Sequence, residues 1–327
     1  MIEYVIRRVI LMIPTVFLIS IIAFIVIELP PGDYVSYYVL ELESRGMDVS
    51  DAMVENIRSQ YGLDKPVYIR YVTWFTKFIR GDLGFSLQWK RPVAELLGSR
   101  LLMTVVVTLT SLAFTWVVAF PIGIHSAIRQ CSIFDYIFSV VGFLGLAIPN
   151  FLFALVLMFL TSKYFHIGVG GLFSRQFETA PWSIAKVFDL AKHLWVPMIV
   201  VGTAGTASLI RILRANLLDE LKKPYVELAR AKGLKESRLV IKYPLRIAIN
   251  PFISSVGWIL PSLISAEVIT AVVLDLPTSG PIFLQALRNQ DMPLAGAFIM
   301  LTGILTVIGT LLSDILLAIV DPRIRYK

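Results

Sequence analysis

Long runs of apolar residues constrain this chain more than any other feature of its sequence. A helix needs about 20 mostly apolar residues to cross the hydrocarbon core of a bilayer. Six stretches reach or approach that length, namely 9–29, 101–124, 136–162, 194–210, 247–274 and 292–320. Only 16% of the 327 residues are charged, whereas soluble domains carry about 25%. The sequence therefore predicts an all-α integral membrane protein with six transmembrane helices.

The basic residues indicate how these helices are oriented. Segment 211–246 contains ten basic and four acidic residues, and the C-terminal tail adds Arg323, Arg325 and Lys327. Because Lys and Arg concentrate in short cytoplasmic loops, we expect this segment and both termini to be cytoplasmic. Orientation in membrane lipid then accounts for the net charge of +7, and no nucleic-acid partner is expected.

This topology divides the chain into four parts. Residues 1–29 form the N-terminal tail and the first span, and residues 30–100 form a large, structured outer segment. Residues 101–320 hold the other five spans with the cytoplasmic loop 211–246 between spans four and five, and residues 321–327 form the cytoplasmic tail.

The outer segment contains an aromatic pattern with helical spacing. Tyr71, Trp74, Phe75 and Phe78 recur on one helix face. Pro66 precedes this helix and Gly81 follows it, as expected for a helix start and stop. A second, shorter helix is expected at about 51–61, ending at Gly62. The aromatic helix either covers a pore or packs on the bilayer and the neighbouring spans. The sequence favours packing.

The cytoplasmic loop contains a short helix that is bracketed by two helix-breaking residues. Pro224 interrupts the extension of span four and suits the first position of a new helix. Gly233 suits the position that follows a helix end, because glycine adopts left-handed backbone angles without a side-chain clash. The intervening two turns would be marginal alone in water, so we expect them to pack against this protein or against a partner.

Residues 227–233 read E-L-A-R-A-K-G, which resembles the E-A-A-x-x-x-G loop of permease subunits in binding-protein-dependent ABC importers. Glu227, Ala229 and Gly233 match that loop, whereas Leu228 replaces its middle alanine. The continuation through Leu234 and L-R-I-A (245–248) is similar to the dipeptide/oligopeptide/nickel permease family. Further resemblances in the same order are Y-V-I-R-R (4–8), L-P-P-G-D (29–33), R-G-D-L-G-F-S (80–86), L-G-L-A-I-P (144–149) and D-P-R-I-R (321–325).

The resemblance implies a prokaryotic plasma-membrane assembly. A second homologous permease subunit, two cytoplasmic ATPase subunits and an external solute-binding protein are the implied partners. ATP and Mg would be bound by the ATPases, and this chain would bind no cofactor. The coupling helix would comprise Pro224, Tyr225, Glu227, Ala229, Arg230, Ala231, Lys232 and Gly233. Segments T-A-G-T-A-S (203–208), A-P-W (180–182) and L-P-T-S-G (276–280) look like an oligosaccharide-importing subgroup, so oligopeptides, oligosaccharides and nickel stay open as solutes.

The chain has no residues that indicate catalysis of its own. It lacks a G-x-x-x-x-G-K-[ST] phosphate loop, its three histidines fall outside any H-E-x-x-H pattern, and its single cysteine excludes an internal disulfide. We therefore expect neither an enzyme nor a metal site.

Two carboxylates inside apolar runs support one alternative, an ion- or proton-coupled secondary transporter. Glu267 and Asp314 are functional candidates because a charge at membrane depth is costly unless it has a partner or a polar cavity. Each could instead form a structural hydrogen bond between spans. Ser254, Ser255 and Ser262 either line a polar pathway with Glu267 or bond to carbonyls of their own helix. The bracketed helix at 224–233 favours the ABC permease, since a self-contained transporter does not need it.

Overall fold

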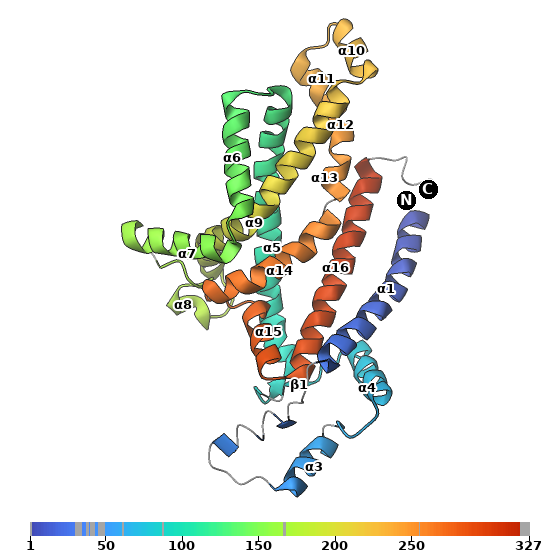
Figure 1. Ribbon diagram of the computed structural model, residues 1–327, viewed down its shortest axis with the longest axis vertical. Helices are drawn as coiled ribbons and strands as arrows, with labels where there is room; N and C mark the ends of the chain where they lie inside the picture. Colours follow the sequence, from blue (N-terminus) through green and yellow to red (C-terminus); the bar gives the residue numbers. More distant parts are fainter. Residues whose placement is uncertain are drawn as a thin grey trace. The chain divides into compact units, whose positions relative to one another are not determined.

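The computed structural model describes residues 2–29, 35–36, 39, 43–44, 50–60, 62–86, 88–165, 168–254 and 256–320. Within them the chain is almost entirely helical (Figure 1). The elements are α1 (Ile2–Glu28), α3 (Asp51–Gln60), α4 (Val67–Ile79), β1 (Phe85–Ser86), β2 (Arg91–Pro92), α5 (Val93–Ile128), α6 (Ile133–Ala147), α7 (Asn150–Leu160), the π-helical turn η1 (Thr161–Phe165), α8 (Arg175–Glu178), α9 (Ile184–Leu221), α10 (Pro224–Ala231), α11 (Glu236–Lys242), α12 (Pro244–Ala248), α13 (Asn250–Ser254), α14 (Val256–Val273), α15 (Ser279–Arg288) and α16 (Met292–Val320).

Four helices in the described part of the chain are long and apolar enough to cross a membrane: α1, α5, α9 and α16. They contain four of the six predicted runs. The run at 136–162 is instead two helices, α6 and α7, bent by 105°. Pro149 explains the bend, because a residue before proline is driven to extended angles, and Ile148 has φ −85° and ψ 121°. Counting this pair as one span gives five.

The run at 247–274 also differs from a single span. It is divided among α12, α13 and α14, and its apolar helical part is the shorter piece Ile259–Val273. Pro244 begins α12 and Pro251 lies at the second position of α13, as expected for a residue that is tolerated in a first helical turn. Ser255 lies outside the described residues.

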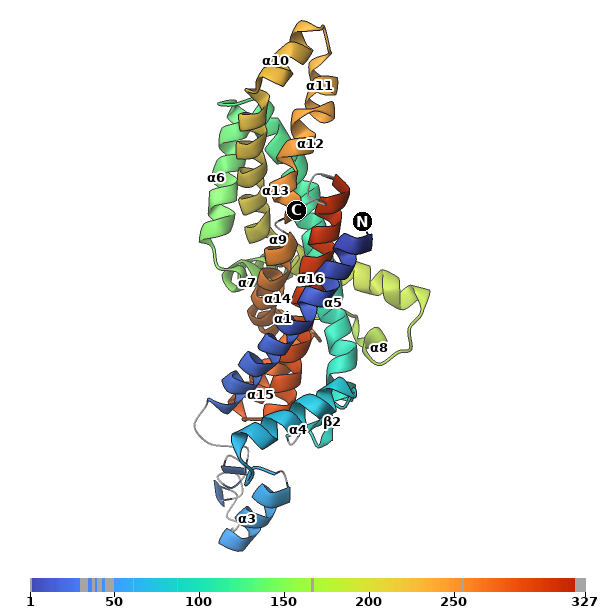
Figure 2. The ribbon, with the colours of Figure 1, turned by 90° about the vertical axis from the view of Figure 1, so that its right-hand side faces the viewer.

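Compact packing divides the chain into two units. The first comprises Met1–Val9, Thr104–Pro277 and Thr306–Lys327, and the second comprises Ile10–Met103 and Thr278–Leu305. In the first unit, α6, α7, α12, α13 and α14 all pack on α9 (Figures 1 and 2). Helix α9 is thus the central support of this unit.

Small residues allow close contacts between α9 and its neighbours in the first unit. A Cβ added to Gly202 of α9 would lie 2.7 Å from Phe114 Cδ1 and 3.0 Å from the Ser111 carbonyl oxygen, both of α5. The Thr115 hydroxyl also donates a hydrogen bond to the Gly202 carbonyl at 3.0 Å. On α6, a Cβ at Gly145 would lie 2.8 Å from Thr203 Cγ2. The segment T-A-G-T-A-S therefore begins within a close-packed helix crossing.

We expect Gly202→Val to destabilise the protein by about 1–3 kcal/mol, because the added carbons overlap a backbone carbonyl that has little room to move. The check is the monodisperse fraction that survives heating in detergent, with the protein fused to a fluorescent reporter. Gly98→Val is the matched control, since a Cβ at Gly98 has nothing within 4 Å. Equal heat resistance of both variants would contradict the close-packing argument.

In the second unit, α4 packs its aromatic face on α1, which confirms the packing interpretation of that pattern. Phe75 contacts Phe17 with ring centroids 5.8 Å apart, and Tyr71 contacts Phe24 at 5.3 Å. The Tyr71 hydroxyl lies 2.9 Å from Ser20 Oγ. Helix α4 begins after Pro66, and Gly81 follows its end with φ +83°. Both boundaries agree with the sequence prediction, as does Gly62 (φ +67°) after α3.

The hairpin formed by β1 and β2 explains part of the R-G-D-L-G-F-S motif. Ser86 and Asp291 are both fully buried in the second unit, and the Ser86 hydroxyl donates a hydrogen bond to the Asp291 carboxylate. The Asp82 carboxylate accepts a hydrogen bond from the Gly84 N–H at 2.9 Å. The Ser86–Asp291 bond holds the hairpin against the residue that precedes α16.

Candidate functional site: a capped helix and its connection to the membrane helices

Helix α10 begins and ends where the bracketing residues predict. Lys223 has extended angles and Pro224 occupies the first helical position. At the other end Gly233 has φ +78°, its N–H donates to the Arg230 carbonyl at 2.9 Å, and the Leu234 N–H donates to the Ala229 carbonyl at 3.4 Å. This pair of bonds is the Schellman arrangement, which satisfies carbonyls at a helix end.

The two faces of α10 have different surroundings. Val226 and Ala229 are 0% and 7% exposed and join the apolar cluster of the first unit. Glu227, Leu228 and Ala231 lie on the opposite face and are exposed, Leu228 by 58%. Figures 1 and 2 show that α10 lies beyond the end of α6 within this unit. The helix therefore packs on its own chain by one face and leaves the other open.

Two side-chain contacts tie α10 to the elements on either side. The Tyr225 hydroxyl donates to Glu220 of α9 at 2.6 Å. Burial raises the pKa of Tyr225, and the bond to Glu220 raises it further, so this hydroxyl stays protonated. Arg230 donates two hydrogen bonds to Glu236 of α11, at 2.7 and 3.1 Å.

The Arg230–Glu236 contact gives the loop a defined response to acid. The hydrogen bond from Arg230 lowers the pKa of the Glu236 carboxyl below its usual value. A lowered folded-state pKa means that the contact stabilises the folded loop at neutral pH and that this contribution is lost as pH falls through the lowered pKa. Both side chains are half-exposed, so solvent screening keeps the contribution small.

An apolar cluster connects α10 with α14. It runs from Val226 and Ala229 through Leu213 and Leu217 of α9 to buried residues of the following helices, namely Leu239, Val240, Leu245, Ala248, Phe252, Ile259 and Leu263. Because protein interiors are close-packed, displacement of one member is transmitted to the next. A displacement of α10 would therefore shift the residues of α14 that belong to the same cluster.

Glu267 lies on α14 one helical turn beyond Leu263 and is 0% exposed. It thus faces the interior of the first unit. The serines proposed to accompany it lie elsewhere, because Ser254 and Ser262 are exposed. Their hydroxyls donate to helix carbonyls, those of Asn250 at 3.0 Å and Ile259 at 2.7 Å. The structure does not bring these two serines together with Glu267 on one face.

We expect Glu267→Gln to insert and assemble normally but to lower transport by roughly tenfold, because it keeps the side-chain volume while removing a buried charge. The measurement is solute uptake into vesicles that contain equal amounts of each variant. Ser265→Ala is the matched control, since this exposed residue of α14 bonds only to the Pro261 carbonyl among the described residues. Wild-type uptake by both Glu267→Gln and Glu267→Leu would show that the Glu267 side chain only fills space and that its charge has no role in transport.

Asp314 has a partner that the sequence did not indicate. Its Oδ2 lies 3.2 Å from Arg8 Nη1, and the two side chains are 23% and 42% exposed. In the sequence, Arg8 stands out only as part of the Y-V-I-R-R motif at the start of the first span. The ion pair joins the first residues of α1 to α16 within the first unit. It therefore favours a structural role for Asp314, as a contact between two helices.

A second ion pair was also missed. Arg214 of α9 donates to both oxygens of Asp135, at 3.1 and 2.9 Å. The same carboxylate accepts from the Cys131 N–H at 3.1 Å, and Ser132 Oγ accepts from the Asp135 N–H at 3.2 Å. The Ser-x-x-Asp spacing would have located this helix start. Arg214, 79 residues further along, could not be found from spacing.

The helices and caps described above define a class, an all-α protein with several membrane-crossing helices. Among the described residues, no group of three His, Cys, Asp or Glu side chains could hold a metal ion. Residues 119–326 match the family described as the binding-protein-dependent transport system inner membrane component, and residues 1–110 match the N-terminal region of the same membrane component. The chain belongs to this family and is a permease subunit of an ABC importer.

Curated relatives align over the whole of this chain and the whole of their own length. The oligopeptide transport system permease protein AppB of Bacillus subtilis is 36% identical. The dipeptide transport system permease protein DppB of Escherichia coli K12 is 29% identical, and the glutathione transport system permease protein GsiC of Escherichia coli O6:H1 is 28% identical. The chain is accordingly a multi-pass protein of the plasma membrane that operates with ATPase and solute-binding partners.

Proposed function

We propose that this chain is one of two membrane subunits of an ATP-driven importer that takes up oligopeptides delivered by an external binding protein. Its membership of the binding-protein-dependent family carries the proposal. The names of its relatives, which transport oligopeptides, dipeptides and glutathione, support peptides as the solute. Membership also favours this function over an ion-coupled secondary transporter.

The proposed assembly contains this permease, a second homologous permease, two cytoplasmic ATPases and the binding protein. ATP and Mg are bound by the ATPases, because this sequence has no phosphate loop. Helix α10 inserts its exposed face into a cleft of one ATPase. Closure of the ATPases then displaces α10, and the apolar cluster transmits that displacement to α9 and α14.

The proposed topology has six spans with both termini in the cytoplasm. The ten basic residues of 211–246 support it, and α12–α14 would supply the fifth span as a broken helix. Such a break is tolerated in a membrane where the freed backbone groups are buried in protein. Ser50 would then lie outside the cell and Ser237 inside.

Introduced cysteines test this topology in a background where Cys131 is replaced by serine. An impermeant thiol reagent added to intact cells should label Ser50→Cys and should spare Ser237→Cys until the membrane is opened. Both serines are exposed, so access is set by the side of the membrane. Labelling of Ser237→Cys in intact cells would overturn the proposed orientation.

Oligosaccharide import is the second candidate, supported by the T-A-G-T-A-S, A-P-W and L-P-T-S-G segments. The close packing around Gly202 and Thr203 gives the first of these segments a structural role, which weakens it as a sign of the solute. Uptake assays on vesicles that contain the complete importer distinguish the two candidates. We expect ATP-dependent accumulation of labelled di- to hexapeptides, and accumulation of oligosaccharides alone would favour the second candidate.

A further inference from the structure

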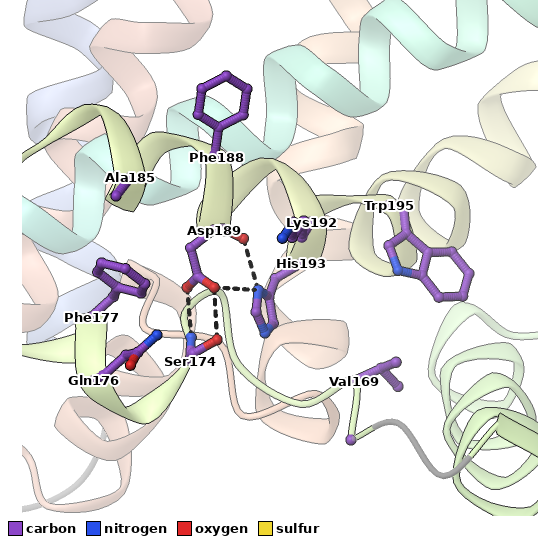
Figure 3. Close-up of a pocket in the computed structure, with 11 residues that line it drawn as sticks. Val169, Ser174, Gln176, Phe177, Ala185, Phe188, Asp189, Lys192, His193 and Trp195 are labelled. Atoms are coloured by element: carbon purple, nitrogen blue, oxygen red, sulfur yellow. Dashed lines mark hydrogen bonds and ion pairs between the residues drawn. The ribbon is translucent and has the colours of Figure 1, made fainter.

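A cavity of about 640 Å³ lies at the end of α9 opposite to α10. Its walls come from the segment before α8, from α8 itself and from the first three turns of α9 (Figure 3). Its volume is in the range of ordinary small-ligand pockets. Every lining residue belongs to the first unit, and neither the apolar cluster nor α10 contributes to it.

The loop that forms one wall is held in place by specific bonds. Ser174 donates to both oxygens of the Asp189 carboxylate, through its N–H and its hydroxyl, each at 2.7 Å. The Gly171 N–H donates to the Leu274 carbonyl at 2.8 Å. Lys186, only 6% exposed, donates to the Ala180 carbonyl at 2.7 Å and lies over the Phe173 ring. The cavity is therefore formed before any ligand arrives.

His193 lines this cavity, and its neutral ring offers a hydrogen-bond acceptor there. Its Nδ1 lies 2.8 Å from the Asp189 carbonyl oxygen, and because a carbonyl can only accept, Nδ1 carries the proton. In the neutral ring Nε2 is then an acceptor. Figure 3 shows the ring extending from α9 on the side where Ser174 and Val169 lie. A ligand N–H is the group that this nitrogen fits.

Lys192 also lines this cavity and supplies a positive charge to it. Within the described part of the chain Lys192 makes no hydrogen bond or ion pair, so its ammonium group is available to a ligand. Both oxygens of Asp189 already accept hydrogen bonds from Ser174. Phe177, Phe188 and Trp195 provide apolar wall. A carboxylate beside an N–H donor and an apolar side chain matches these three features.

We propose that this cavity binds a carboxylate carried by a peptide segment, with Lys192 holding the carboxylate and His193 accepting a nearby peptide N–H. The inference rests on the proposed function in one respect, because it is the proposed topology that places the cavity outside the cell. Two sources offer this chemistry there. One is the C-terminus of the transported peptide, and the other is an acidic residue on a surface loop of the binding protein.

The first experiment uses the complete importer in lipid nanodiscs without ATP and titrates it calorimetrically with N-acetyl-alanyl-alanine. We expect saturable binding, a loss of affinity of about tenfold in Lys192→Gln through removal of a charge-assisted hydrogen bond, and no binding of the C-terminal amide of the same peptide. Arg175→Gln is the matched control, because this exposed basic residue begins α8 beside the cavity but is not part of its lining. It should bind like the wild type.

The second experiment measures the affinity of the purified, peptide-free binding protein for the same nanodiscs. If the carboxylate comes from the binding protein, Lys192→Gln should weaken this affinity by about tenfold while the acetylated peptide does not bind. Wild-type values for Lys192→Gln in both experiments would overturn the proposal. ATP-driven peptide uptake by the wild-type importer is recorded in parallel, so that a failure of the proposed function is seen separately from a failure of the cavity assignment.

Discussion

Gly233→Val should leave the protein inserted in the membrane while abolishing most of its association with the ATPases. Gly233 has φ +78°. For a residue with a Cβ, this left-handed conformation costs roughly 1–2 kcal/mol of conformational free energy, and the cost is higher for a β-branched residue such as valine. The strain falls on the bonds that end α10, from Gly233 to Arg230 and from Leu234 to Ala229. The open face of α10 would then be presented at the wrong angle.

The measurement is co-purification of the ATPase subunits, followed by uptake into vesicles, and we expect both to fall by about tenfold or more. Gly98→Val serves as control because Gly98 lies outside the left-handed region and has open space around its Cβ position. Glu227→Ala tests the exposed face without backbone strain and should weaken association in the same direction. Normal transport by Gly233→Val and Glu227→Ala together would remove the basis for assigning α10 to coupling.

Arg214→Ala should lower the stability of the folded protein, because it breaks the ion pair that joins the α5–α6 turn to α9. The Asp135 side chain is 5% exposed and Arg214 is its bidentate partner. Breaking a fully buried pair costs about 3–5 kcal/mol because a charge is left uncompensated. Arg214 is 35% exposed, so we expect a smaller loss of roughly 2–3 kcal/mol. Since α9 leads directly into α10, we also expect ATP hydrolysis to respond less to the loaded binding protein.

A double-mutant cycle separates this pair from general damage to the helix. Asp135→Asn, Arg214→Ala and the combined variant are compared by heat resistance in detergent, and a coupling energy near zero would contradict the pair's role. Arg211→Ala is the control, because Arg211 is an exposed basic residue one turn earlier on α9. It should resemble the wild type.

Local patterns in the sequence were sufficient for most of the helices and for the boundaries of α10. Pro66 and Gly81 around α4, and Pro224 and Gly233 around α10, act through the backbone of their own segment. Their effect therefore does not depend on the rest of the fold. The bend at Pro149 was also local, yet the long apolar run concealed it, because hydropathy alone does not register a change of helix direction.

The sequence by itself determined that the chain lies in a membrane, that a capped helix follows α9 and that Glu267 and Asp314 are unusual. Each of these is a property of composition or of neighbouring residues. Only the tertiary structure decided the partners of the charges. It joined Arg8 to Asp314 and Asp135 to Arg214, and it separated Glu267 from Ser254 and Ser262. Such pairings depend on how helices distant in sequence are packed, and no periodicity along the chain carries that information.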